Sequence, residues 1–315
     1  MKKLLITRQL PEANLATARA RYEVTVRSET VGLTVAEAKA ALAEYDAILV
    51  TLGDQFTAEA FTGEIRCGVL ANFGVGYNHI DADAAAKAGV AVSNTPDVVT
   101  DATADIGMTL ILSTCRRAGE GERLVRADKW TGWEPTQMLG THVTGKTVGI
   151  VGMGRIGQAV ARRCHYGFEM PILYFNRSQK SVDIPARQVE SLHDLMAQAD
   201  IIVVTVPGGG ANTALIDAAA LAVMKPTGIF VNIARGDVVD EPALIKALED
   251  GQIAGAGLDV FAKEPLVPDA FRALDNVVLL PHLGTAALEV REAMGQMGLD
   301  NIFAWDDGRP LPQAV

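Results

Sequence analysis

The chain has 315 residues, of which 49% are hydrophobic and 21% are charged, and its formal net charge is −10 at pH 7. This length favours two domains over one, and the composition is that of a globular protein with ample material for a core. The negative charge and the lack of any Lys/Arg block exclude a nucleic-acid-binding protein. Any anionic ligand must therefore be held by locally placed cations and amides.

The cysteines predict neither disulfides nor a metal site. Cys67, Cys115 and Cys164 are odd in number, far apart and in no CxxC arrangement, so a reducing, cytoplasmic location is expected. The histidines other than His282 have no spaced partners that suggest metal ligands. The start of the chain predicts a strand rather than a signal peptide. No stretch approaches the roughly 20 apolar residues that span a bilayer, so no membrane partner is expected.

Short β-branched runs alternate with Ala-rich helical stretches from the start of the chain. Strands are predicted at residues 4–7, 23–27, 47–50 and 68–72, and helices at residues 12–21, 34–44 and 82–88. The second of these helices begins with a capping-box pattern formed by Thr34 and Glu37. Alternation of this kind predicts a doubly wound α/β layer.

The alternation restarts in the second part of the chain. A long helix is predicted at residues 103–117, followed by a polar segment that contains Trp and Gly and runs to residue 145. Further strands are predicted at residues 147–151, 172–175, 201–206, 228–233, 255–260 and 277–280. The chain is therefore expected to hold two α/β units, the second of which starts near residue 100.

A glycine-rich turn with G-x-G-x-x-G spacing follows the predicted strand at residues 147–151 and opens a helix predicted at residues 158–163. In such turns the first glycine permits the tight turn, the second lets the backbone approach a pyrophosphate, and the third allows close helix–strand packing. The helix N-terminus adds unpaired N–H groups and a positive dipole end. This context predicts a dinucleotide site, and a merely structural turn is the alternative. The cofactor-binding residues predicted here are Gly152, Gly154, Arg155, Ile156 and Gly157.

The residues after the strand at 172–175 distinguish NAD from NADP. An acidic residue there would bind the ribose hydroxyls and repel a 2′-phosphate, but this chain has Asn176, Arg177 and Ser178. Asn and Ser can donate to phosphate oxygens, and Arg177 can make paired, charge-assisted bonds to them. We predict a preference for NADP(H), with NAD(H) as the alternative cofactor. An exposed basic loop with no ligand is the other interpretation.

Polar residues that can perform chemistry come just beyond successive predicted strands. Arg235 follows the strand at 228–233, and Asp259 ends the strand at 255–260, with Glu264 five residues later. His282 follows the strand at 277–280. Taken singly, each has a structural explanation as an ion pair, a cap or a turn residue. Together they predict one site, because α/β folds bind ligands at the carboxyl ends of their strands.

In the order of these motifs the chain resembles the D-isomer-specific 2-hydroxyacid dehydrogenase family. The matching stretches are residues 145–157, 224–236, 255–261, 264–265 and 281–282, and residues 74–78 also fit. The resemblance implies two doubly wound, Rossmann-like domains with the active site in the interdomain cleft. The substrate-binding domain would comprise residues 1–98 and 288–315, and the dinucleotide-binding domain residues 99–287. Hinge closure would exclude water. The segment at about 100–143 commonly makes a homodimer in this family.

The family's catalytic trio corresponds here to Arg235, Glu264 and His282. The resemblance implies that Arg235 binds the substrate carboxylate and polarises the 2-oxo group through its planar fork of donors. His282 would give a proton to the ketone oxygen as the nicotinamide delivers hydride to C2, and Glu264 would favour the imidazolium. Asp259 would meet the nicotinamide carboxamide or tune the site.

The same resemblance implies further ligand contacts. The backbone amides of Val75 and Gly76 would hold the substrate carboxylate, with Leu52 and Gly53 on the neighbouring loop. Trp133 resembles the Trp that glyoxylate/hydroxypyruvate reductases extend into the partner subunit's site, and packing of the dimer arm is the alternative. The remaining predicted cofactor contacts are Thr103, Val206, Pro207, Thr213, Ile233, Arg235, Asp259, His282 and Gly284.

One stretch departs from the family's pattern. Gly208, Gly209 and Gly210 stand where the family usually has a threonine-containing loop. Extra glycines add flexibility and remove side-chain contacts. The cofactor contacts carried over to this loop are therefore the least supported.

The function implied is an NADP(H)-dependent oxidoreductase that interconverts a small 2-oxo acid and its D-2-hydroxy acid. Residues 176–178 and Trp133 favour the glyoxylate/hydroxypyruvate reductases within the family. Larger 2-oxo acids such as phenylpyruvate are alternative substrates, and phosphoglycerate dehydrogenase is another alternative activity. Glu264 disfavours a formate dehydrogenase. A non-enzymatic, NAD(H)-binding corepressor-like scaffold is the alternative from another class, and the retained catalytic residue types disfavour it.

Overall fold

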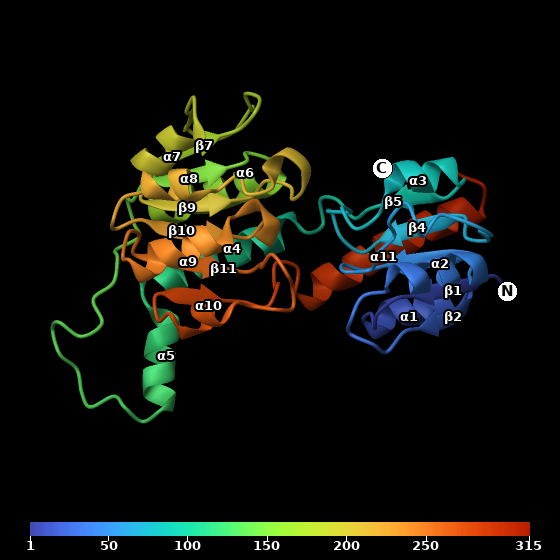
Figure 1. Ribbon diagram of the computed structural model, residues 1–315, viewed down its shortest axis with the longest axis horizontal. Helices are drawn as coiled ribbons and strands as arrows, with labels where there is room; N and C mark the ends of the chain where they lie inside the picture. Colours follow the sequence, from blue (N-terminus) through green and yellow to red (C-terminus); the bar gives the residue numbers. More distant parts are fainter. The chain divides into compact units, whose positions relative to one another are not determined.

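The computed structural model describes residues 1–315. The chain divides into two compact units, one formed by Met1–Val99 with Thr285–Val315 and the other by Thr100–Gly284. Each unit is built on one parallel sheet (Figure 1). The predicted α/β class and the presence of two such units are confirmed. No helix combines the length and the apolar character needed to cross a membrane.

The first unit has a five-stranded sheet in the order β2-β1-β3-β4-β5. Its strands are β1 (Lys3–Ile6), β2 (Glu23–Val26), β3 (Ala47–Val50), β4 (Val69–Asn72) and β5 (Ala91–Ser93). All neighbouring strands in this sheet run parallel. The inner strands β3 and β4 are buried at every position, as expected for parallel strands covered on both faces.

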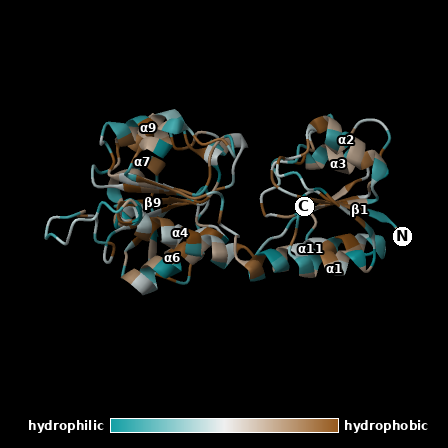
Figure 2. Cartoon of the chain, turned by 90° about the horizontal axis from the view of Figure 1, so that it is seen from below, coloured by the Kyte–Doolittle hydropathy of each residue, from teal (hydrophilic) through white to brown (hydrophobic).

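Helices cover both faces of this sheet: α2 and α3 on one side, α1 and α11 on the other (Figure 2). Their bounds are α1 (Glu12–Arg19), α2 (Val35–Glu44), α3 (Ala82–Lys87) and α11 (Leu288–Asp306). Successive strand residues point to opposite faces. Ile48 accordingly packs in the core under α2 and α3, and Leu49 packs in the core under α1 and α11. The sheet is therefore doubly wound.

The second unit has a seven-stranded parallel sheet in the order β12-β11-β10-β9-β6-β7-β8. Its strands are β6 (Val148–Val151), β7 (Ile172–Phe175), β8 (Ala186–Gln188), β9 (Ile201–Val204), β10 (Ile229–Asn232), β11 (Gly255–Leu258) and β12 (Val277–Leu279). The chain passes from β6 to β7 and β8, then returns to the other side of β6 as β9. This reversal creates a topological switch point beside β6, where α/β sheets bind ligands.

Seven helices accompany the second sheet. They are α4 (Thr100–Cys115), α5 (Ala118–Arg126), α6 (Arg155–Phe168), α7 (Leu192–Gln198), α8 (Ala218–Ala222), α9 (Glu241–Glu249) and α10 (Asp269–Ala273), with 3-10 turns at Gly210–Asn212 and Gly236–Val238. Figure 2 shows α4 and α6 on one face of the sheet and α7 and α9 on the other. Because all seven strands run parallel, their carboxyl ends lie at one edge of the sheet and form a single rim.

The elements agree with the sequence predictions where the hydrophobic pattern is strong. β3 and β7 have the predicted bounds, and the capping box of α2 is present, with Thr34 and Glu37 bonded reciprocally. The helix after the glycine turn is longer than predicted, since it begins at Arg155 and ends at Phe168. The polar segment after residue 117, for which no helix was predicted, contains α5. The short elements β5, β8, α7, α8, α9 and α10 were not predicted.

Candidate active site

Arg235 stands three residues beyond β10, on a turn that the last residue of the strand holds in place. Asn232 is 1% exposed. Its Oδ1 accepts from the Ala234 N–H at 2.9 Å, and its Nδ2 donates to the Arg235 carbonyl at 2.9 Å. Asn232 was not among the residues predicted from the sequence. The signal that points to it is an asparagine at the end of an otherwise apolar strand.

Packing against Arg235 and Asp237 explains the glycine at position 208 of the three-glycine loop. A Cβ on Gly208 would lie 2.8 Å from Arg235 Cγ and 2.7 Å from Asp237 Oδ1. The Gly209 N–H donates to Asp237 Oδ2 at 2.7 Å, and Gly209 has a φ of 75°. At Gly208 the loop therefore lies against the Arg235 side chain, where a larger residue would clash. Burial lowers the pKa of Arg235, and the charges of Glu264 and Asp237 oppose this shift.

His282 and Glu264 form a pair. His282 Nδ1 lies 2.8 Å from Glu264 Oε2, and Glu264 Oε1 accepts from the Phe261 N–H at 3.0 Å. Burial raises the pKa of Glu264, but the hydrogen bond and charge of His282, the Phe261 amide and the charge of Arg235 together bring this pKa below its usual value. Glu264 therefore keeps its negative charge beside the imidazole at neutral pH.

Asp259 anchors the backbone on which His282 stands. Its Oδ1 accepts from the Leu283 N–H at 2.6 Å and its Oδ2 from the Gly284 N–H at 2.9 Å, while its carbonyl accepts from the His282 N–H at 2.9 Å. His282 has a φ of 54°, a left-handed conformation that costs a non-glycine residue roughly 1–2 kcal/mol. The three bonds hold this conformation. Burial raises the pKa of Asp259.

Thr103 and Gly284 lie beside this anchor. A Cβ on Gly284 would be 3.4 Å from both Thr103 Cγ2 and Asp259 Oδ2, so Thr103, on α4, touches the loop that carries His282. Ile233 is buried next to Arg235 and packs towards Gly107 of α4. Three of the predicted cofactor residues are therefore held within the packing around the loops that carry Arg235 and His282.

The glycine turn after β6 fits the three roles expected of its glycines. Gly152 has a φ of 97°, and a Cβ there would lie 2.7 Å from Val206 Cγ1. A Cβ on Gly157 would lie 2.2 Å from the Gly152 carbonyl oxygen. Nothing lies within 4 Å of a Cβ built on Gly154, so this glycine faces open space at the start of α6. A bound pyrophosphate fits that space and the N–H groups of the helix end.

Asn176 has a different role from its neighbours. Its Oδ1 accepts from the Met153 N–H at 3.2 Å, inside the glycine turn, and its Nδ2 donates to the Ser178 carbonyl at 2.7 Å. The side chain thus ties the glycine turn to the loop after β7. Arg177 and Ser178 are exposed, so they are the side chains open to a phosphate. Of the other predicted cofactor residues, Arg155, Pro207 and Thr213 are exposed, and Ile156 and Val206 are half-buried.

In the first unit, Leu52 and Gly53 lie on a turn after β3 that is built on a fully buried carboxylate. Asp54 accepts from the N–H groups of Thr51 and Leu33, each at 2.9 Å, and Arg8 lies 3.5 Å from its Oδ1. Gly53 has a φ of 94°, which favours glycine, and Leu52 is exposed. Val75 and Gly76 lie on the loop after β4, with Val75 exposed.

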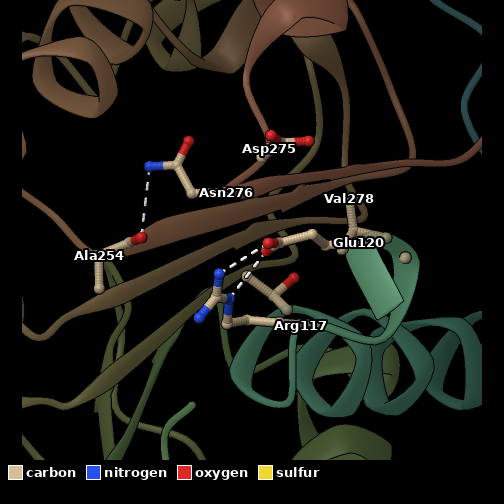
Figure 3. A pocket seen from close by; sticks show the side chains of 8 residues that line it. Arg117, Glu120, Ala254, Asp275, Asn276 and Val278 are labelled. Atoms are coloured by element: carbon tan, nitrogen blue, oxygen red, sulfur yellow. Dashed lines mark hydrogen bonds and ion pairs between the residues drawn. The ribbon is translucent and has the colours of Figure 1, made fainter. Parts of the chain in front are cut away.

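Two cavities of the second unit lie along β12 and α5, away from these residues. One, of about 270 Å³, is shown in Figure 3, where Arg117 pairs with Glu120 and Asn276 donates to the Ala254 carbonyl. The other, of about 500 Å³, runs beside β12 and α10. Trp133, on the segment after α5, is 78% exposed. No group of three His, Cys, Asp or Glu side chains is arranged to hold a metal ion.

A parallel sheet with a dinucleotide-type turn, and an imidazole–carboxylate pair with a half-buried guanidinium beyond its strands, define an α/β oxidoreductase. Residues 108–284 match the family described as "D-isomer specific 2-hydroxyacid dehydrogenase, NAD binding domain". The chain belongs to this family. It is therefore an oxidoreductase that acts on the CH–OH group of its donor with a nicotinamide cofactor.

The similarity extends over the whole chain. It is 41% identical over 319 residues to the glyoxylate reductase of Pyrococcus furiosus, covering 99% of this chain and 95% of that protein. It is 37% identical over 321 residues to the glycerate dehydrogenase of Hyphomicrobium methylovorum, covering 100% and 99%. A crystal structure of the NADPH-dependent glyoxylate/hydroxypyruvate reductase of Sinorhizobium meliloti, with NADP and malonate, matches with a TM-score of 0.89 and 32% identity, covering 100% of this chain and 96% of that one.

Proposed function

We propose that this chain reduces glyoxylate and hydroxypyruvate to the corresponding 2-hydroxy acids, with NADPH as the preferred cofactor. The observation that carries the proposal is the pair formed by His282 Nδ1 and Glu264 Oε2 at 2.8 Å. Arg235 is near enough to this pair for its charge and that of Glu264 to shift each other's pKa. The unit Thr100–Gly284 binds the dinucleotide, and Met1–Val99 with Thr285–Val315 supplies substrate contacts.

Each residue has a role that its surroundings support. The bound nicotinamide supplies the hydride that reduces C2 of the 2-oxo acid. Arg235 binds the substrate carboxylate and polarises the 2-oxo oxygen through its planar donors. Because Nδ1 of His282 faces Glu264, the proton that the ketone oxygen receives is held at Nε2. The backbone amides of Val75 and Gly76, with the turn at Leu52 and Gly53, hold the substrate carboxylate.

The substrate class is tested by NADPH oxidation with glyoxylate, hydroxypyruvate, pyruvate and phenylpyruvate. We expect the highest kcat/KM with glyoxylate or hydroxypyruvate, the activities named for the relatives and for the matching structure. A higher kcat/KM with phenylpyruvate would replace this proposal by the larger-substrate alternative. Cofactor binding without oxidation in the presence of any of the four acids would instead favour the scaffold alternative.

The cofactor preference rests on Arg177 and Ser178, which are exposed after β7 where an acidic residue would favour NAD. We expect kcat/KM to be at least tenfold higher with NADPH than with NADH. Replacing Arg177 by alanine removes charge-assisted bonds to the 2′-phosphate, each worth about 1.5–3 kcal/mol, and should raise KM for NADPH by ~10–100-fold. KM for NADH is the internal control and should stay within twofold. A wild-type preference for NADH would contradict the proposal.

A homodimer accounts for the apolar surface of the segment that follows α4. Val125, Trp130, Trp133 and Leu139 are each more than half exposed on or after α5. A second copy of the chain would bury them. Light scattering should give twice the 33.4 kDa mass of the chain. For Trp133→Ala, a higher KM in an intact dimer would support a role in the partner subunit's site, and a monomer would support arm packing.

A further inference from the structure

The loop that follows β4 has its carbonyl groups held by two asparagines. Asn72, the last residue of the strand, donates from Nδ2 to the carbonyls of Gly74 at 2.9 Å and Gly76 at 3.0 Å. Asn94, directly after β5, donates from Nδ2 to the Val75 carbonyl at 2.9 Å. Two side chains on neighbouring strands thus bind three successive backbone carbonyls.

The direction of the carbonyls fixes the direction of the amides. In a trans peptide the N–H points opposite to the C=O of the same peptide unit, and the one cis bond of the chain lies elsewhere, at Glu264–Pro265. The N–H groups of Val75, Gly76 and Tyr77 therefore each point away from the asparagine that holds their peptide. None of the three donates to an acceptor in the protein. Val75 and Tyr77 are exposed, at 39% and 36%.

We propose that Asn72 and Asn94 are positioning residues that preset the backbone amides of Val75, Gly76 and Tyr77 as donors for the substrate carboxylate. This inference rests on the proposed function and adds to it the third donor, Tyr77, and the two side chains that orient the set. The asparagines act through the backbone, so they bind neither substrate nor cofactor themselves.

An amide side chain suits this role because it donates without carrying charge. Asn72 is 1% exposed, and its Oδ1 has no partner in the protein, so the fold uses its donor side. A carboxylate at this position could only accept, would lose both bonds to the loop, and would place negative charge behind an anion site. The second unit uses the same arrangement, since Asn232 ends β10 and holds the turn that carries Arg235.

The test is Asn72→Asp, measured by steady-state kinetics and by binding of oxamate, an unreactive 2-oxo acid analogue, to the enzyme–NADPH complex. We expect KM for glyoxylate and Kd for oxamate to rise together by ~10–100-fold, since loss of hydrogen bonds to a charged ligand costs about 1.5–3 kcal/mol. The kcat should change less than threefold, and Kd for NADPH should not change. Asn72→Ser keeps one donor, so its KM should be intermediate. Asn94→Ser provides a second test if the first variant fails to fold.

Asn14→Asp is the matched control. Asn14 is 2% exposed in the same unit and donates from Nδ2 to the Glu292 carbonyl at 2.9 Å, between α1 and α11. Its replacement removes the same donor and should lower Tm without changing KM or oxamate binding. If Asn72→Asp and Asn94→Ser also lower only Tm, the two asparagines are structural and the inference is overturned. If the wild-type enzyme neither binds oxamate nor reduces a 2-oxo acid, the proposed function itself fails.

Discussion

Replacing His282 by alanine should lower kcat for 2-oxo acid reduction by ~10²–10⁴, the usual contribution of a positioned general acid. The imidazole is held by Glu264 at Nδ1 and by the three bonds of Asp259 to the loop beneath it. The comparison is made at saturating NADPH and glyoxylate, so that it reports kcat. His193→Ala, at an exposed position on α7, is the control and should keep full activity. Near-wild-type turnover by the His282 variant would remove this residue from the mechanism.

The pairing of Glu264 with His282 predicts a change in the pH profile. The contacts of Glu264 lower its pKa, so its carboxylate stays charged beside the imidazole down to a pH below the usual range for a glutamate. In the wild-type enzyme kcat/KM should therefore fall on the acidic side only as pH drops through this lowered pKa. Glu264→Gln removes the carboxylate that positions the imidazole, so it should lower kcat/KM at neutral pH and abolish this acidic limb. An identical pH profile in Glu264→Gln and wild type would show that the pair does not operate in catalysis.

Replacing Arg235 by glutamine should lower kcat/KM by ~10²–10³, because removing the guanidinium leaves the substrate carboxylate without its charge partner, at a cost of about 2–5 kcal/mol. Burial lowers the pKa of this guanidinium, yet an arginine remains charged. A partly buried guanidinium attracts a carboxylate more strongly than an exposed one does, because the local dielectric constant is lower. Arg235→Lys keeps the charge but loses the planar fork of donors. Its kcat/KM should therefore exceed that of Arg235→Gln by less than tenfold.

The control for this prediction is Arg187→Gln. Arg187, on β8, is exposed and donates to Gln198 Oε1 at 2.7 Å, so its replacement should leave kcat/KM unchanged. Steady-state kinetics with glyoxylate at saturating NADPH make the comparison. If Arg235→Lys matched the wild-type enzyme, a point charge would suffice, and the proposed two-point binding of the substrate would be wrong.

The sheets could be predicted because inner strands of each are continuous apolar runs. Residues 47–50 and 172–175 have no other stable place than a strand covered on both faces, and they are β3 and β7. The glycine turn was predictable for a similar reason, since Gly152 needs a positive φ and Gly157 allows no Cβ. Both features depend on backbone geometry that the residue type dictates locally.

The segment after α4 was not predictable in the same way. Arg117 adopts a φ of 51° and separates α4 from α5 without the glycine that usually marks such a break. None of the residues of α5 is buried within the chain. Its sequence is mostly polar and includes Gly119 and Gly121, which disfavour a helix, so propensity did not indicate one. Elements of three to five residues, such as β8 and α10, are too short for periodicity to identify.

Within the site, the sequence indicated residues at strand ends but not the contacts that orient them. Arg235 and His282 could be grouped because parallel strands end at one rim. The contacts of Asp259 with the N–H groups of Leu283 and Gly284 could not be inferred, since they depend on the path of the loop. The same holds for Asn72 and Asn232, which bond to backbone groups of the motif residues rather than to their side chains.

The most direct test of the central claim follows the hydride and the configuration of the product. The enzyme is given hydroxypyruvate and NADPH deuterated at both C4 positions, and the glycerate formed is examined by mass spectrometry and chiral chromatography. The account predicts one deuterium at C2 of D-glycerate for each NADPH oxidised, with the hydroxyl proton from His282. L-glycerate, or glycerate without deuterium at C2, would contradict it.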